Sequence, residues 1–169
     1  LLETPMFKNV GEANARETGW ALRTLTALYI ETNEEKWLEK CDWIVGHFEE
    51  WEEKYGLWLA PYTDNTAIRV VFMISVAVGS LMRYYRVSPQ EKIKGMILRA
   101  VKDLCDNARL ENGLFYYKEL PSLKRLGNNP LILEALTIAY ELSGDEEYIK
   151  AGLPTLKYVM SYKAAGLSF

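Results

Sequence analysis

Residues that bind metals or form disulfides are scarce in this sequence. Its 169 residues include one histidine and two cysteines. His47 lies beside an apolar helical stripe without a second ligand at a metal-binding spacing, so we interpret it as a half-buried packing residue. Cys41 and Cys105 lie within apolar helical stripes and are expected to be buried free thiols. The sequence therefore predicts neither a metal site nor a cofactor.

The chain also lacks an excess of charge and a long apolar run. Twenty Lys and Arg residues are spread among 23 Asp and Glu, and the net charge of −3 gives no reason to expect nucleic acid or an anionic membrane as a partner. The longest apolar run, residues 70–82, covers about 13 residues and is too short to span a bilayer. There is no Gly-rich phosphate loop and no nucleophile elbow.

The sequence shows no signal peptide and begins Leu-Leu-Glu without an initiator Met. We therefore expect a fragment or a processed form of a longer protein, and the compartment stays undecided.

Aromatic residues, in contrast, are abundant. They make up 12% of the chain, with five Trp and eleven Tyr. Such rings fill protein cores, and they also stack against the C–H faces of sugars. Composition does not separate the two uses, so the position of each ring has to decide.

A Gly-Leu pair marks the end of each of three repeat units. The pair recurs at positions 56–57, 113–114 and 166–167, which are 57 and 53 residues apart. The end of the first helix of each unit is a second marker, at positions 28, 81 and 139. Both markers share a period of about 55 residues. The predicted units span residues 12–63, 64–122 and 128–169.

Each unit is predicted to be a hairpin of an inner apolar helix and an outer amphipathic helix. In the first unit, the inner helix spans residues 12–31, and the outer one begins at Glu34 and carries a stripe of apolar residues at helical spacing. In the second, residues 67–82 have Arg69 as their one charge, which predicts a helix buried on every side. Pro89 is expected at the first position of its partner helix.

The third unit repeats this order. Pro130 opens its inner helix, and Glu146 begins the outer one after a turn. Pro154 is expected to kink or restart that last helix.

This alternation predicts an all-α fold in which about three helical hairpins form part of an (α/α) toroid. A closed ring needs more than three hairpins, so further hairpins of the same toroid or another copy of the chain are expected partners. The inner helices run parallel in such a ring, and their N-termini gather at one end with the corner loops. A ligand site is expected at that end.

The strongest candidate motif is RETGW at positions 16–20. Arg16 and Trp20 are four residues apart and so share one helix face, where a guanidinium can pair with a carboxylate while the indole stacks on a sugar. With Gly19 and Leu22, they match Arg-x-x-Gly-Trp-x-Leu. The chain here resembles the six-hairpin (α/α) glycosidases, particularly the unsaturated rhamnogalacturonyl and glucuronyl hydrolases. The resemblance implies that Arg16 and Trp20 line a substrate cavity. The alternative is a packing tryptophan beside a salt-bridged arginine.

Two carboxylates are candidates for acid/base catalysis. The similar hydrolases use an Asp at the N-terminus of an inner helix, which implies Asp64 or Glu17, although neither lies in a motif that matches the family. Asp64 is alternatively an N-cap, because Asp-Asn-Thr precedes an apolar helix. A paired-carboxylate mechanism would couple Asp64 with Glu17 or Glu134.

Other candidate ligand contacts come from the corner segments. Trp58, Tyr62 and Tyr117 are expected to bind the substrate through their rings. A buried guanidinium needs an acidic partner or an anionic ligand, so Arg69 is expected to pair with Glu17 or Glu134, or to bind a substrate carboxylate.

These features predict a carbohydrate-processing domain of a glycoside hydrolase or polysaccharide lyase that acts on an acidic polysaccharide. One alternative is a module that binds carbohydrate without catalysis. Another is a helical repeat that binds other proteins through its aromatic corners.

Overall fold

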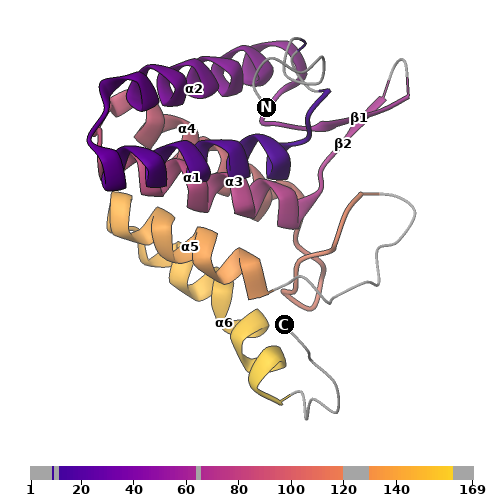
Figure 1. Ribbon diagram of the computed structural model, residues 1–169. Helices are drawn as coiled ribbons and strands as arrows, with labels where there is room; N and C mark the ends of the chain where they lie inside the picture. Colours follow the sequence, from indigo (N-terminus) through magenta and orange to yellow (C-terminus); the bar gives the residue numbers. More distant parts are fainter. Residues whose placement is uncertain (1–8, 10–11, 64–65, 120–129, 162–169) are drawn as a thin grey trace.

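The protein is built from six α-helices and one short two-stranded sheet within the described residues. The structure, a computed structural model, describes residues 9, 12–63, 66–119 and 130–161 (Figure 1). The elements are α1 (Ala15–Thr32), α2 (Glu35–Tyr55), β1 (Ala60–Thr63), β2 (Thr66–Ile68), α3 (Val71–Tyr85), α4 (Glu91–Asn107), α5 (Pro130–Ser143) and α6 (Glu146–Ser161). The all-α prediction is confirmed.

The helices form three consecutive hairpins in two layers. Helix α1 packs against α2, α3 against α4, and α5 against α6, while α1, α3 and α5 lie side by side in one layer. These three helices begin at the same end of the molecule, as Figure 1 shows. The segments that lead into them therefore meet at that end. Completion of a ring by further hairpins stays a prediction.

Helix α1 is held by caps at both ends. The Asn14 side chain accepts hydrogen bonds from the backbone N–H groups of Arg16 and Glu17, at 3.1 and 3.2 Å. Asn33 ends the helix in the left-handed region, with φ of 54°. Because Asn14 satisfies the first free N–H groups, the helix begins three residues later than the apolar pattern predicts.

The second inner helix begins later than residue 67, where it was predicted. Residues 66–68 instead form β2, which pairs antiparallel with β1. The N–H of Val71 donates to the carbonyl of Tyr117 at 3.1 Å, which holds the preceding chain extended against residues far along the sequence. Arg69 consequently lies before α3. The helix itself is buried over most of its surface, as its apolar composition predicts.

Two further predictions about helix boundaries concern proline. Pro89 does not occupy the first position of α4, because that helix begins at Glu91 with Gln90 as its N-cap. Helix α6 continues through Pro154 to Ser161 without a restart.

The Gly-Leu corners turn the chain at positive φ. Gly56 and Gly113 have φ of 71° and 80°, a region that favours glycine. A Cβ atom at Gly113 would lie 2.9 Å from Cγ of Pro154, so the second corner packs directly against α6. The third corner, residues 166–167, lies outside the described residues.

The core joins all three hairpins. It contains Phe48, Trp51 and Trp58 as well as the apolar faces of α3 and α4. Cys41 is buried and Cys105 is half-buried, and both are free thiols. Burial raises the pKa of each thiol to about 11.

Candidate functional site

The N-terminal end of α1 brings an arginine, a carboxylate and a half-exposed indole together. The guanidinium carbon of Arg16 lies 5.0 Å from the centre of the Trp20 ring and 5.7 Å from that of Phe72 on α3. Trp20 is 48% exposed. Both distances fall in the range of a cation–π contact. Arg16 therefore connects the first turns of two neighbouring inner helices, α1 and α3.

Phe72 extends this cluster to Tyr117. Its ring stacks on that of Tyr117, with centroids 5.1 Å apart and planes inclined by 11°. Tyr117, which the sequence suggests separately from Arg16 and Trp20, thus belongs to the same cluster through Phe72. The role of Phe72 is absent from the sequence prediction, because an apolar residue in an apolar helix carries no signal of its own.

Glu17 is engaged by its own helix. Its carboxylate accepts from the backbone N–H of Asn14 at 3.3 Å, which completes a capping box, and from Nη2 of Arg16 at 3.2 Å. Its side chain is 34% exposed. The first role of Glu17 is therefore to cap α1 and to hold Arg16.

Nε of Arg16 is buried and has no hydrogen-bond partner among the described residues. The guanidinium is thus partly satisfied, by Glu17 at one nitrogen and by the two aromatic rings. An unpaired buried donor is unfavourable, so the hold of Glu17 and the two rings on Arg16 leaves the guanidinium short of one acceptor.

Arg69 is occupied by two acidic side chains that differ from the predicted ones. Its Nε and Nη2 donate to Asp103 on α4 at 2.7 and 3.0 Å, and its Nη1 donates to Glu119 at 2.6 Å. Hydrogen bonds to Asp103 first, and then to Glu119, raise the pKa of Arg69 above its ordinary value despite partial burial. Arg69 is therefore a structural residue that joins the segment before α3 to α4.

Trp58 is a core residue. It is 1% exposed, its ring lies 4.9 Å from that of Phe48, and its Nε1 donates to the carbonyl of Phe48 at 3.1 Å. A ring enclosed in this way has no face open to a sugar. Trp58 thus fills the core beneath the first corner.

Two of the candidate residues are not placed by the structure. Of Tyr62 only the backbone, in β1, is described, and Asp64 lies outside the described residues.

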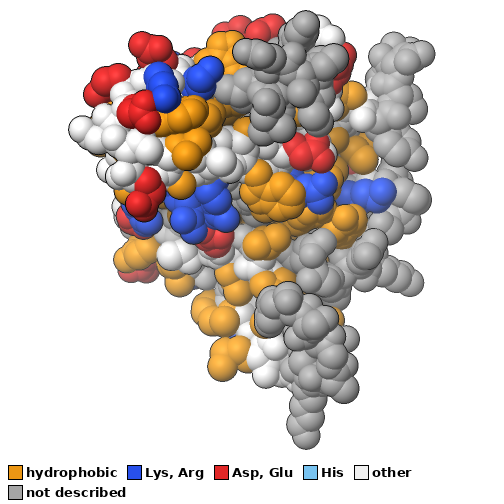
Figure 2. All heavy atoms as spheres, viewed as in Figure 1, with side chains coloured by type: hydrophobic (Ala, Val, Ile, Leu, Met, Phe, Trp, Pro, Cys, Tyr) orange, Lys and Arg blue, Asp and Glu red, His pale blue; other side chains and the backbone are white. Residues whose placement is uncertain are grey.

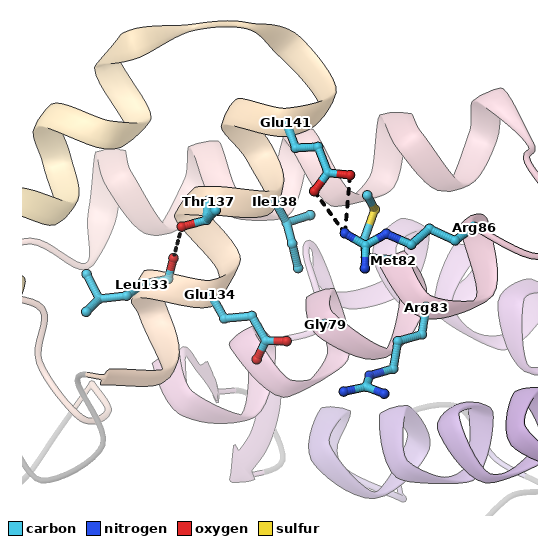
Figure 3. Close-up of a pocket in the computed structure, with 9 residues that line it drawn as sticks. All are labelled: Gly79, Met82, Arg83, Arg86, Leu133, Glu134, Thr137, Ile138 and Glu141. Carbon is cyan, nitrogen blue, oxygen red and sulfur yellow. Dashed lines mark hydrogen bonds and ion pairs between the residues drawn. The ribbon is translucent and has the colours of Figure 1, made fainter.

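A groove of mixed charge lies between α3 and α5 beside their contact. Its volume is about 450 Å³, and Figure 3 shows Arg83 and Glu134 extending into it from the two helices. Arg86 and Glu141 form an ion pair across it at 2.9 Å. Glu134, predicted as a partner of Arg69, lies instead beside Gly79, where a Cβ atom would be 3.1 Å from Oε1.

His47 belongs to no metal centre in the part of the chain that the structure describes. Within the described ranges, no group of three or more His, Cys, Asp or Glu side chains is placed to hold a metal ion. His47 is 6% exposed and stacks on Trp43 with ring centroids 5.7 Å apart. None of the helices in the described part of the chain is long and apolar enough to cross a membrane.

No protein-family model, no curated protein and no solved structure matches this chain. The likeness of residues 16–22 to the six-hairpin glycosidases therefore stays a prediction.

Proposed function

We propose that this chain binds an acidic carbohydrate at the N-terminal end of α1 and α3, as part of a larger (α/α) toroid of the glycoside hydrolase or polysaccharide lyase type. The observation that carries the proposal is the position of the Arg16 guanidinium over the half-exposed ring of Trp20. The exposed part of the indole is available for stacking on a sugar ring. The guanidinium beside it is suited to the sugar's carboxylate.

The electrostatics of the cluster support an acidic ligand over a neutral one. Among the described residues, Arg16 pairs with a single carboxylate, that of Glu17, and the side chains of this pair are 30% and 34% exposed. Its buried Nε still lacks an acceptor within the described residues. The exposed part of the guanidinium can pair with a uronic acid carboxylate, and charge-assisted hydrogen bonds of this kind are stronger than neutral ones.

The geometry favours binding over catalysis by Glu17. That carboxylate already accepts hydrogen bonds from Asn14 and Arg16. Within the proposal, Asp64 is the acid that would protonate a substrate, while Arg16 and Trp20 orient the sugar.

Calorimetric titration of the full chain with uronic acid oligosaccharides tests the proposal. We expect Trp20→Ala and Arg16→Ala each to weaken binding at least about tenfold, which corresponds to about 1.4 kcal/mol. With a neutral oligosaccharide of the same length, Trp20→Ala should still weaken binding, whereas Arg16→Ala should have little effect.

Trp43→Ala is the matched control. Trp43 is exposed to a similar degree, 45%, but lies on α2 in the other layer of helices. The control should bind like the wild type. Unchanged affinity of Trp20→Ala for the acidic oligosaccharide would overturn the proposal.

A further inference from the structure

Among the residues that the structure describes, large exposed apolar side chains are confined to the two outer hairpins. In the described part of the chain there are eight of them: Trp20, Ile30 and Trp43 on the first hairpin, and Tyr140, Ile149, Leu153, Leu156 and Met160 on the third. The middle hairpin, α3 and α4, has none among its described residues. It is covered by α1 on one side and by α5 on the other. Within the described chain each outer hairpin packs against one other hairpin, and its opposite side carries exposed apolar side chains.

Helix α6 carries four of these eight side chains in one stripe. Ile149, Leu153, Leu156 and Met160 follow one another at spacings of four, three and four residues, so they lie on one side of the helix. They are 39%, 44%, 42% and 78% exposed. The outer helices α2 and α4 bury their apolar stripes, whereas α6 buries only Ala151, Gly152 and Thr155. Figure 2 shows hydrophobic side chains gathered on the surface over α5 and α6.

A groove runs between α5 and α6 beside this stripe. Its volume is about 190 Å³, and its lining includes Leu133, Leu136, Gly152, Leu153 and Leu156. The position between α3 and α4 that corresponds to this groove is filled, because α5 packs against both of those helices. On the second hairpin, this surface is covered by the next inner helix, α5. On the third hairpin, the corresponding surface is exposed to solvent.

The first hairpin has a free side of its own. Glu49 and Glu52 of α2 face α4, where they bind Lys92 and Arg99. Trp43 lies nine residues before Glu52, which is two and a half helical turns, and therefore points away from α4. Its exposed ring therefore lies on the side of the first hairpin that faces away from the second hairpin. We call this side the Trp43 edge; it is opposite to the side formed by α5 and α6.

We propose that two copies of this chain associate head to tail, with the α5–α6 edge of one copy packed against the Trp43 edge of the other. This contact continues the packing between successive hairpins that occurs twice within the chain. Helical repeat arrays need polar outer faces at their ends to stay soluble, and the α6 edge does not have one. Such a heterologous contact closes into a ring or extends into a filament, according to the rotation between copies.

Pairing of two α6 edges with each other would not repeat the packing between successive hairpins, in which the inner helix α5 lies against both α3 and α4.

Sedimentation equilibrium of the full chain over a wide range of concentration tests the proposal. We expect the average mass to rise from the 19.4 kDa of one chain to at least twice that value. A mass that stays at 19.4 kDa at every concentration would overturn self-association.

Variants of the two edges test the head-to-tail arrangement. Leu153→Asp places a charge in the α5–α6 edge, and Met160→Asp does the same at a more exposed position. Trp43→Asp places a charge in the other edge. Each variant alone should therefore be monomeric. An equimolar mixture of Leu153→Asp and Trp43→Asp retains one intact edge of each kind and should form a one-to-one dimer. Persistent association of Trp43→Asp by itself would contradict the head-to-tail contact.

Ile30→Asp is the control for adding a charge at an exposed apolar position. Ile30 is 62% exposed but lies three turns after Gly19, on the side of α1 that faces α3. This variant should associate like the wild type. Circular dichroism checks that every variant retains its helices.

Discussion

Arg69 and Asp103 form a two-pronged ion pair between the segment before α3 and the last turns of α4. Nε of Arg69 lies 2.7 Å from Oδ2 of Asp103, and Nη2 lies 3.0 Å from Oδ1. Glu119 binds the third nitrogen of the same guanidinium and also accepts from the backbone N–H of Arg69. This network holds the entrance of the central inner helix against two distant parts of the chain.

Asp103→Asn should destabilise the fold by about 2–3 kcal/mol, because it removes the charge that pairs with a partly buried guanidinium. Urea unfolding measures the change. Asp106→Asn is the matched control on the same helix, since it loses only an exposed pair with Lys102 and should change stability by less than about 1 kcal/mol. Equal effects of the two substitutions would show that the Arg69 network is not structural.

Stability should fall between neutral and mildly acidic pH because of His47. Burial holds the pKa of His47 below the ordinary 6.5, against an opposing effect of Glu50. Below pH 6.5 the unfolded chain therefore binds a proton that the folded chain does not, and the free energy of unfolding decreases as the pH falls. His47 is the only histidine, so His47→Phe should flatten this part of the pH profile. The free energy of unfolding of both proteins is measured with urea between pH 7.5 and 5.5. If it falls as steeply in His47→Phe as in the wild type, His47 is not the cause of the pH dependence.

Gly113→Ala should destabilise the protein more than Gly144→Ala does. Both glycines have positive φ, 80° and 72°, so each substitution costs about 1 kcal/mol or more in backbone conformation. A Cβ atom at Gly113 additionally meets Pro154 at 2.9 Å, whereas nothing lies within 4 Å of one at Gly144. Thermal unfolding of the two variants separates the packing effect from the backbone effect. Equal losses would mean that the contact between the corner and α6 adds no constraint.

Asp64→Asn should abolish turnover of oligosaccharides that end in an unsaturated uronic acid, if the chain acts with the acid that the family resemblance implies. Glu17→Gln should retain measurable turnover, because its main effect is to weaken the hold on Arg16. Loss of the ultraviolet absorbance of the substrate double bond follows the reaction. If Asp64→Asn were fully active and Glu17→Gln inactive, the catalytic acid would be Glu17 and not Asp64.

Much of the fold was predictable because its signals are local. The six helices follow from apolar periodicity, and the starts of α2, α5 and α6 agree with the predictions from Glu34, Pro130 and Glu146 to within one residue. The start of α3 was not predictable, since residues 66–68 pair with β1 and the N–H of Val71 bonds to Tyr117. The apolar composition of a stretch does not by itself determine whether its first residues form a strand or a helix.

The sequence by itself determined the helical hairpins and the neighbourhood of Arg16 and Trp20, because residues four apart on a helix share a face. Only the tertiary structure decided which aromatic rings and charges remain open to a ligand. Trp58 is enclosed by the core, and Arg69 is bound by Asp103 and Glu119, which are 34 and 50 residues away along the chain. Such contacts depend on how the helices pack, and no local pattern specifies them.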